Sequence, residues 1–167
     1  MSRLALASAL LACASTALGA QSRDSALAGR PIAVWLSASV GPGRASGSEP
    51  SLIGGQFALW ASVDRLTVGV RRGGASNIDN KDTYDTAVLV GLRARVDHAT
   101  ILGTLGPGVI GGTRFGDRVG SEAGLSAAVE CALTARYVGA GLAGFAAIGR
   151  RTRFAGVGFT LELGKIQ

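Results

Sequence analysis

The sequence is poor in the side chains that build metal sites, nucleophilic active sites and disulfide frameworks. Its 167 residues include one histidine and two cysteines. The single histidine, His98, excludes a His-rich metal site. Cys13 lies in an N-terminal segment that we expect to be removed, which would leave Cys131 alone and exclude a disulfide within the mature chain. The fold must then be held by its hydrogen bonds and its surroundings.

Charged residues, aromatic residues and long apolar runs are also scarce. Charged residues make up 17% of the chain and aromatic residues 5%, yet the mean hydropathy is +0.33. Beyond the N-terminus, no uninterrupted apolar run is long enough for a membrane-spanning helix. The 26 glycines would each cost a helix about 1 kcal/mol relative to alanine. High hydropathy without long apolar runs is typical of membrane strands with alternating faces.

The first residues have the layout of a secretory signal peptide. Arg3 gives a positive start, an uncharged run follows over 4–18, and small residues up to Ala20 provide a cleavage point before Gln21. We therefore expect an exported protein. The expected division is a signal peptide at 1–20, a short linker at 21–30 and one β-domain at 31–167.

Two other interpretations of the N-terminus stay open. The apolar run is an N-terminal anchor helix in one of them, although it is short and poorly flanked for that role. In the other, Leu10-Leu11-Ala12-Cys13 is a lipobox and Cys13 is acylated. The apolar run continues past Cys13 to Leu18, which favours cleavage near Ala20.

Beyond the linker, apolar residues recur at every second position. The clearest segment is 88–97, where Val and Leu alternate with Gly, Arg and Asp, as in a strand whose two faces differ. The fifth segment is inferred from the need to continue the pattern, and Gly106-Pro107-Gly108 is expected to end it because proline cannot donate to a ladder. The strands are expected at 32–40, 56–64, 66–71, 88–97, 99–105, 125–134, 138–143 and 157–164.

The expected connections alternate between long and short. Tight turns are expected near Asp64-Arg65, Asp97-His98 and Thr134-Ala135, and a shorter final connection near 149–152. The long connections are expected at 42–51, 73–83 and 108–120. Two Gly-Pro-Gly motifs, at 41–43 and 106–108, close odd-numbered segments, which raises the hypothesis of a duplicated half-barrel.

This pattern resembles the small outer-membrane barrels of the OmpX and OmpA transmembrane-domain type, over nearly all of the mature chain. The resemblance implies an all-β fold, an eight-stranded antiparallel up-and-down transmembrane barrel in a Gram-negative outer membrane. It also implies lipid or lipopolysaccharide and the outer-membrane assembly machinery as partners, and we expect a monomer. The chain departs from the pattern because it ends at Gln167 without the terminal aromatic residue that this machinery reads.

The face opposite the apolar residues is mostly Gly, Ala, Ser and Thr. Such a face suits the lumen of an eight-stranded barrel, which side chains fill, better than a soluble exterior rich in Lys and Glu. A soluble, lipocalin-like barrel in the periplasm stays the alternative. We expect a polar network in the lumen from Arg93, Arg95, Glu130 and Glu162. Trp35 and Trp60 are expected to face each other there and to leave no continuous water channel.

Arginine is concentrated in or beside the expected long loops. Guanidinium groups bind phosphates bidentately, so these residues are candidates for contact with the headgroups of anionic lipid. The alternative is a solvated rim balanced by Glu49, Asp79, Asp82, Asp85, Asp117 and Glu122. The candidate lipid contacts are Arg44, Arg72, Arg114, Arg118, Arg150, Arg151 and Arg153.

Other chemistry has weaker support in the sequence. Residues 79–85 carry several oxygen ligands, but Lys81 interrupts them and a polar turn is the better interpretation than a calcium site. His98 with Thr100 invites comparison with outer-membrane lipid A deacylases, although we expect His98 in a periplasmic turn. Export and the lack of a stacking platform argue against nucleic-acid binding. No cofactor or metal is expected.

We therefore expect a non-catalytic barrel with a filled lumen, which has a structural or surface-interaction role in the cell envelope. Two alternatives remain: binding or passage of a small apolar ligand, and a lipid-modifying enzyme that uses His98.

Overall fold

The computed structural model describes residues 32–45, 52–76, 81–114 and 117–166. Contacts divide the chain into a unit at 1–30 and a unit at 31–167, and the second unit contains all of the described residues. The expected signal peptide and linker, including Cys13, lie outside them. No helix in the described part of the chain is long and apolar enough to span a membrane.

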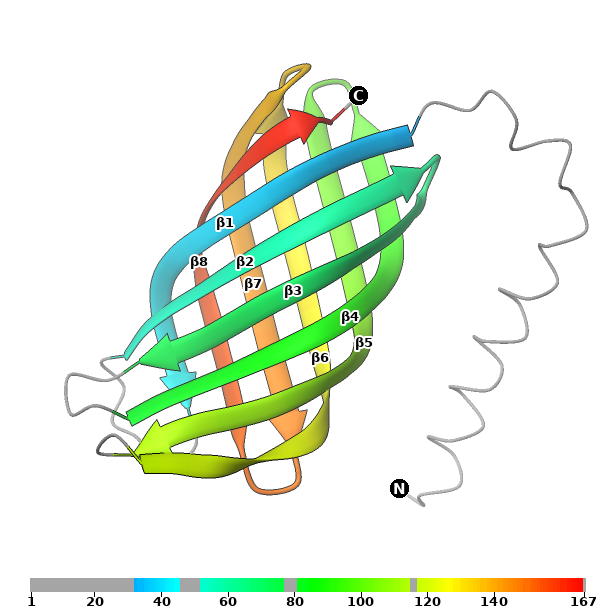
Figure 1. Cartoon of the computed structure of the whole chain (residues 1–167). Coiled ribbons are helices and arrows are strands. Elements are labelled where there is room, and N and C mark those ends of the chain that lie inside the picture. The colour runs from blue at the N-terminus through cyan, green and yellow to red at the C-terminus, as the bar shows by residue number, and fades with distance from the viewer. Residues whose placement is uncertain (1–31, 46–51, 77–80, 115–116, 167) are drawn as a thin grey trace, which may run out of the picture. The chain divides into compact units, whose positions relative to one another are not determined.

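Eight antiparallel strands follow one another around a closed barrel, in which β8 pairs with β1 (Figure 1). The expected fold class is confirmed, including the strand that was inferred to continue the pattern. The strands are β1 Ile32–Ala45, β2 Leu52–Val63, β3 Leu66–Ser76, β4 Lys81–Val96, β5 Ala99–Arg114, β6 Asp117–Thr134, β7 Val138–Gly149 and β8 Arg153–Lys165.

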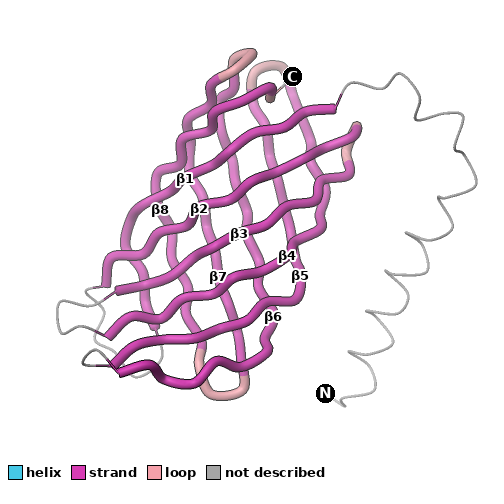
Figure 2. Tube along the Cα trace, in the orientation of Figure 1, coloured by secondary structure: helices cyan, strands magenta, loops and turns pink. Residues whose placement is uncertain are grey.

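The connections after β2, β4 and β6 lie at the same end of the barrel as the C-terminal end of β8 (Figure 2). We call this the turn end and the opposite one the loop end. Two of these turns hold an aspartate in the left-handed region, Asp64 at φ 53° and Asp97 at φ 52°. Aspartate tolerates this conformation better than most residues because its short side chain bonds to the nearby backbone. The tight turns are thus confirmed.

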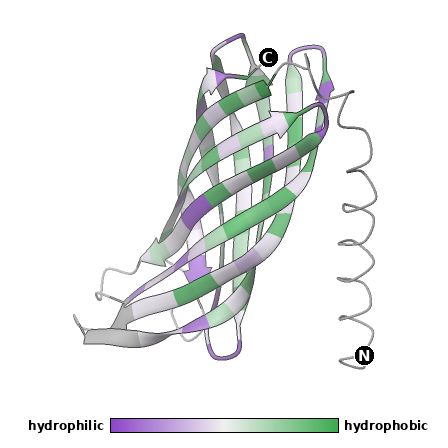
Figure 3. Ribbon diagram, turned by 45° about the vertical axis from the view of Figure 1, so that its right-hand side comes forward, coloured by the Kyte–Doolittle hydropathy of each residue, from purple (hydrophilic) through white to green (hydrophobic). Residues whose placement is uncertain are grey.

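The large apolar side chains point outward. Along β1, Val34, Leu36 and Val40 are exposed, whereas Trp35, Ser37 and Ser39 between them are buried. Figure 3 shows the same alternation of hydrophobic and polar residues along other strands. The soluble alternative required the apolar face to point inward, and it is therefore wrong. The barrel has an apolar exterior and a lumen lined largely by small and polar residues.

The strands are longer than the sequence pattern predicted, so the predicted bounds of the long connections were wrong. β1 continues to Ala45, which leaves residues 46–51 before β2. β3 continues to Ser76 and β4 begins at Lys81. Residues 115–116 alone separate β5 from β6. These added positions are mostly Gly, Ser, Thr and charged residues, which carry little apolar signal but complete the backbone ladder of a closed sheet.

The two Gly-Pro-Gly motifs lie inside strands, so the expectation that 106–108 ends the fifth strand was also wrong. Pro107 lies opposite Leu125 of β6, while the β4–β5 pairing is interrupted at Pro107 and resumes in the same register. Pro42 falls in a matching interruption between β1 and β8. Each proline therefore occupies a place where its missing N–H breaks no ladder hydrogen bond.

Candidate functional site

The lumen contains a fully buried ion pair toward the loop end. Arg71 of β3 and Asp85 of β4 form a salt bridge with both side chains at 0% exposure. Asp85 also accepts hydrogen bonds from the Ser126 hydroxyl and, at 3.1 Å, from the Gly73 backbone N–H. Arg71 donates to the Ala127 carbonyl at 2.8 Å. These added bonds satisfy charges that would be costly to bury unpaired.

Two phenylalanines close the lumen beside this pair. The Arg71 guanidinium carbon lies 5.9 Å from the centroid of the Phe145 ring. Phe145 in turn packs edge-on against Phe154, with ring centroids 6.3 Å apart. Both phenylalanines are buried. The interior is therefore filled at the level of the ion pair.

The middle of the lumen holds Glu130 and the tryptophan pair. Glu130 accepts hydrogen bonds from Ser37 at 2.9 Å and from Gln56 at 3.0 Å, and the Trp60 indole N–H donates to Ser37 at 2.9 Å. Trp35 lies directly opposite Trp60 in the β1–β2 register, with ring centroids 6.5 Å apart. Both indoles are buried, so they fill the interior at this level.

The turn end of the lumen is organised around Arg93. Its guanidinium lies over the Trp35 ring, 4.6 Å from the centroid, and donates to the Ile166 carbonyl at 2.5 Å. Glu162 is buried nearby and interacts electrostatically with Arg93. Thr100 and Thr134 share a hydrogen bond of 3.1 Å across the same end. This end is polar. Trp35 is the one large aromatic side chain among these residues, so the end is less tightly filled than the middle.

Three of the four residues of the expected polar network are linked in the lumen, because Glu162 interacts electrostatically with both Arg93 and Glu130. Arg93, Glu130 and Glu162 are buried in the lumen, but Arg95 is exposed at the turn end, where its Nε donates to the Asp97 carbonyl at 3.0 Å. The buried ion pair is made by Arg71 and Asp85, which were not expected in the network. In the segment expected at 66–71, Arg71 alternates with the apolar Val68 and Val70, which puts it on the inward face. Asp85 was missed because its strand was expected to begin at 88 and the residue was counted as a rim acid.

Exposed arginines lie on the outer surface of the barrel at the loop end. Arg72 lies next to Phe57 of β2 in the register and stacks over Tyr84, 5.0 Å from the ring centroid. The side chains of Arg114 and Arg118 lie outside the described ones. The others are exposed: Arg44, Arg72, Arg150, Arg151 and Arg153.

Glu122 holds the turn between β7 and β8 at this end. Its carboxylate accepts hydrogen bonds from the backbone N–H groups of Arg151, at 3.0 Å, and of Thr152, at 2.7 Å. Desolvation acts to raise the pKa of Glu122, but these hydrogen bonds outweigh it and the pKa is lowered. Glu122 lies beyond Leu125, an outward-facing apolar residue of β6.

Of the expected polar turn at 79–85, positions 79–80 lie outside the described residues, and the rest does not form a turn. Residues 81–85 belong to β4, where Asp82 is exposed and Asp85 points into the lumen. The Ser76 hydroxyl donates to Asp82 at 2.5 Å. Because the two carboxylates face opposite sides of one strand, they cannot bind the same ion. Among the described residues, no group of three His, Cys, Asp or Glu side chains is placed to hold a metal.

His98 lies in the two-residue turn between β4 and β5 and is exposed. The hydroxyl of Thr100 points away from it into the lumen, where it bonds to Thr134 at 3.1 Å. The Thr100 hydroxyl is therefore not placed to act as a nucleophile beside His98. Cys131 is exposed on the apolar exterior, as its place in the sequence pattern indicated.

A scan against models of known protein families finds no match to this chain, and neither does a search of curated proteins. A search of solved structures finds several small outer-membrane barrels. Ail, the attachment invasion locus protein of Yersinia pestis, has 12% identity and a TM-score of 0.52 over 80% of this chain and 95% of its own. Neisserial surface protein A has 9% identity and a TM-score of 0.58, with 79% and 96% covered.

The N-terminal β-barrel domain of Pseudomonas aeruginosa OprF is similar to the same degree. It has 12% identity and a TM-score of 0.53, over 79% of this chain and 96% of that domain. Identities this low show a shared fold. The closed register, the filled lumen and these neighbours together establish that the chain has the fold of the small eight-stranded outer-membrane β-barrels.

Proposed function

We propose that this protein is a non-catalytic β-barrel of a bacterial outer membrane, with a structural or surface-contact role in the envelope. One observation carries the proposal: large apolar side chains face outward on every strand, while charged side chains are buried inside. This distribution suits lipid as the surrounding solvent. On β8, outward residues from Ala155 to Leu163 are apolar, which matches the roughly 9–11 residues that a tilted strand needs to cross a bilayer.

The filled lumen supports a role without solute passage. The buried Arg71–Asp85 pair with the neighbouring Phe145–Phe154 pair fills one level of the interior, and the two paired tryptophans fill another. A general porin needs a lumen wide enough for water, and eight strands enclose only enough space for side chains. The proposal therefore assigns contacts with other molecules to the outer surface and the two ends.

We further propose that the exposed arginines at the loop end contact anionic lipid phosphates. Their position on the outer surface at the loop end supports this, because phosphorylated headgroups of the outer leaflet would lie at that end. Arg72 is held in place by Tyr84, which reduces the entropy lost on binding. One structure of Ail, a barrel of this fold, is a complex with the heparin analogue sucrose octasulfate, so an anion binds at least one such protein.

Two measurements test the barrel proposal. Protein extracted from membranes in mild detergent should migrate differently on a gel before and after boiling, because the closed ladder resists detergent until heated. In planar bilayers it should give no stable open conductance steps, whereas a general porin reconstituted in the same way gives them. Release of the protein by osmotic shock would contradict the membrane location. Stable open steps would contradict the filled lumen.

A further inference from the structure

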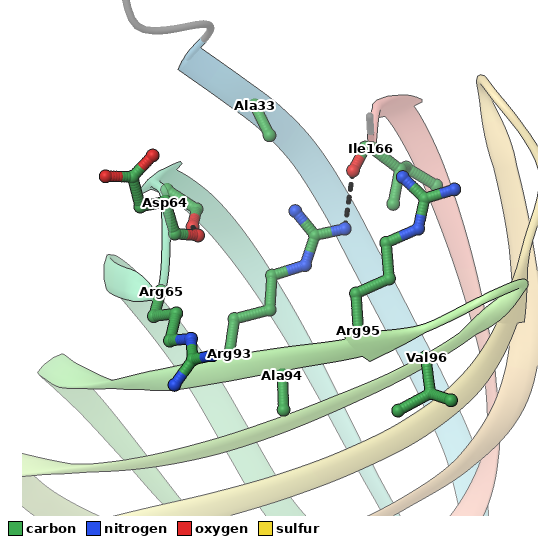
Figure 4. Close-up of a pocket in the computed structure, with 9 residues that line it drawn as sticks. Ala33, Asp64, Arg65, Arg93, Ala94, Arg95, Val96 and Ile166 are labelled. Atoms are coloured by element: carbon green, nitrogen blue, oxygen red, sulfur yellow. Dashed lines mark hydrogen bonds between the residues drawn. The ribbon is translucent and has the colours of Figure 1, made fainter.

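A cluster of arginines surrounds a cavity at the turn end of the barrel. Arg93 and Arg95 extend from β4 in the direction of Ile166, and Arg65 belongs to the turn between β2 and β3 (Figure 4). The Arg93 backbone N–H donates to the Arg65 carbonyl at 2.7 Å, which fixes that turn against β4. The cavity measures about 500 Å3 and is lined by Ala33, Ser62, Asp64, Arg65, Arg93, Ala94, Arg95, Val96 and Ile166.

Arg93 is held rigidly at the base of this cavity. Only 8% of the residue is exposed. The Trp35 ring supports one side of the guanidinium, and one terminal nitrogen donates to Ile166. Its Nε has no hydrogen-bond partner among the described residues. A buried guanidinium N–H without a partner is costly, and an acceptor bound in the cavity would remove that cost.

The charges lining the cavity favour an anion. Three arginines line it, and Asp64 is the one acidic residue among the lining residues described above. The Ser62 hydroxyl donates to the Asp64 carbonyl at 3.2 Å and fixes the backbone of this turn. Glu162 interacts with Arg93 from the lumen side. Arg65 and Arg95 are exposed, so an incoming ligand can reach their guanidinium groups from the turn end.

We propose that this cavity binds a phosphate group, with Arg93 at its base and Arg65 and Arg95 at its mouth. Planar guanidinium groups match the oxygens of a phosphate bidentately. The volume is larger than a phosphate needs and falls within the usual size of small-molecule sites, which leaves room for the organic part of a phosphate ester. In the proposed orientation the site opens toward the periplasm, away from the arginines of the loop end.

The first test is a titration of the refolded barrel in a zwitterionic detergent with inorganic phosphate and then with glycerol 3-phosphate. The Nε–Hε resonances of the arginines report binding by NMR, with sodium chloride added to keep the ionic strength constant. We expect a saturable shift of the Arg93 resonance, because its Nε lacks a partner in the free protein. A shift that grows linearly with phosphate, or none in any of the conditions below, overturns the proposal.

Matched variants separate a built site from general attraction. Arg95→Gln removes an exposed charge at the mouth and should weaken phosphate binding at least about tenfold, which is the effect of losing a hydrogen bond to a charged group. Arg136→Gln removes an exposed charge from the β6–β7 turn at the same end, outside the lining of the cavity, and should leave the affinity unchanged. Both positions are exposed, so neither change should prevent folding. Equal weakening by the two substitutions contradicts a site formed by Arg65, Arg93 and Arg95.

The same titration distinguishes the two sources of phosphate. Binding of the soluble phosphates indicates a free phosphate ester as the ligand. If the Arg93 resonance moves only in bicelles that contain phosphatidylglycerol, and not in phosphatidylcholine bicelles, the ligand is a lipid headgroup. Either result supports the site when Arg95→Gln weakens the binding at least about tenfold. Failure in both media overturns the phosphate site, while the membrane barrel itself is tested separately by its heat-dependent gel migration.

Discussion

At the scale of single residues, the buried ion pair shows what a sequence pattern can and cannot locate. Alternation alone placed Arg71 on the inward face. It did not identify Asp85 as the partner, because Thr83 and Thr86 beside it carry no apolar signal and the segment looks like a loop. The partner follows only from the register of β3 with β4. In that register Gly73 lies opposite Asp85, so Arg71, two residues before Gly73 on the same face, lies diagonally across from Asp85.

Removing one member of this pair should destabilise the barrel strongly. Arg71→Met leaves the Asp85 carboxylate buried without its counter-charge, which typically costs about 3–5 kcal/mol. The urea midpoint in detergent, followed by gel mobility, measures the change. Replacing the adjacent exposed residue, Arg72→Met, should cost less than about 1 kcal/mol. The double replacement Arg71→Met with Asp85→Leu should recover part of the loss, and equal losses for the single and double variants would count against an ion pair.

At the scale of the strands, the sequence predicts all eight elements but not where they end. Apolar alternation stops where a strand leaves the lipid, yet the hydrogen-bond ladder continues, as in β6 from Asp117 to Ser121. The Gly-Pro-Gly motifs looked like strand ends for the same reason. In the barrel they mark two interruptions, between β4 and β5 and between β8 and β1. The two interruptions lie four strands apart around the barrel, which is the spacing that the hypothesis of a duplicated half-barrel predicts.

The interruption beside β4 makes a sharp prediction about glycine. A Cβ on Gly106 would lie 2.0 Å from the Val88 carbonyl oxygen, whereas one on Gly103 of the same strand would meet nothing within 4 Å. Gly106→Ala should therefore force the two backbones apart and lower the stability by about 1–3 kcal/mol. Gly103→Ala should be neutral or slightly stabilising, by up to about 1 kcal/mol. Urea midpoints compare the two, and an unchanged midpoint for Gly106→Ala would mean that the strands can separate freely there.

At the scale of the whole molecule, the closed register explains why the lumen could be anticipated in outline. Eight strands leave space only for side chains, so small residues and a few charges on the inward face predict a filled interior. The site at the turn end could not be anticipated. Arg65 stands in a turn and Arg93 and Arg95 in a strand, and only closure of the barrel brings them around one cavity with Ile166.

The orientation of the barrel can be tested with single cysteines. In a Cys131→Ser background, Ser121→Cys lies at the loop end and His98→Cys at the turn end, and both positions are exposed. A membrane-impermeant maleimide should label Ser121→Cys on intact cells but His98→Cys only after the outer membrane is permeabilised. The reverse pattern would place the turn end at the cell surface. In the unsubstituted protein, Cys131 should resist the reagent both before and after permeabilisation, because it faces the acyl chains.

The inward position of both tryptophans changes what an optical experiment on this protein would see. Trp35 and Trp60 are buried against each other, and Trp35 is covered by Arg93. Brominated acyl chains quench indoles that touch lipid, so they should have little effect here. The emission spectrum would instead follow the moment at which β1, β2 and β4 enclose the two rings. Tryptophan fluorescence is usually used to follow the insertion of a barrel into the bilayer. In this protein it would report the closure of the interior around the two indoles.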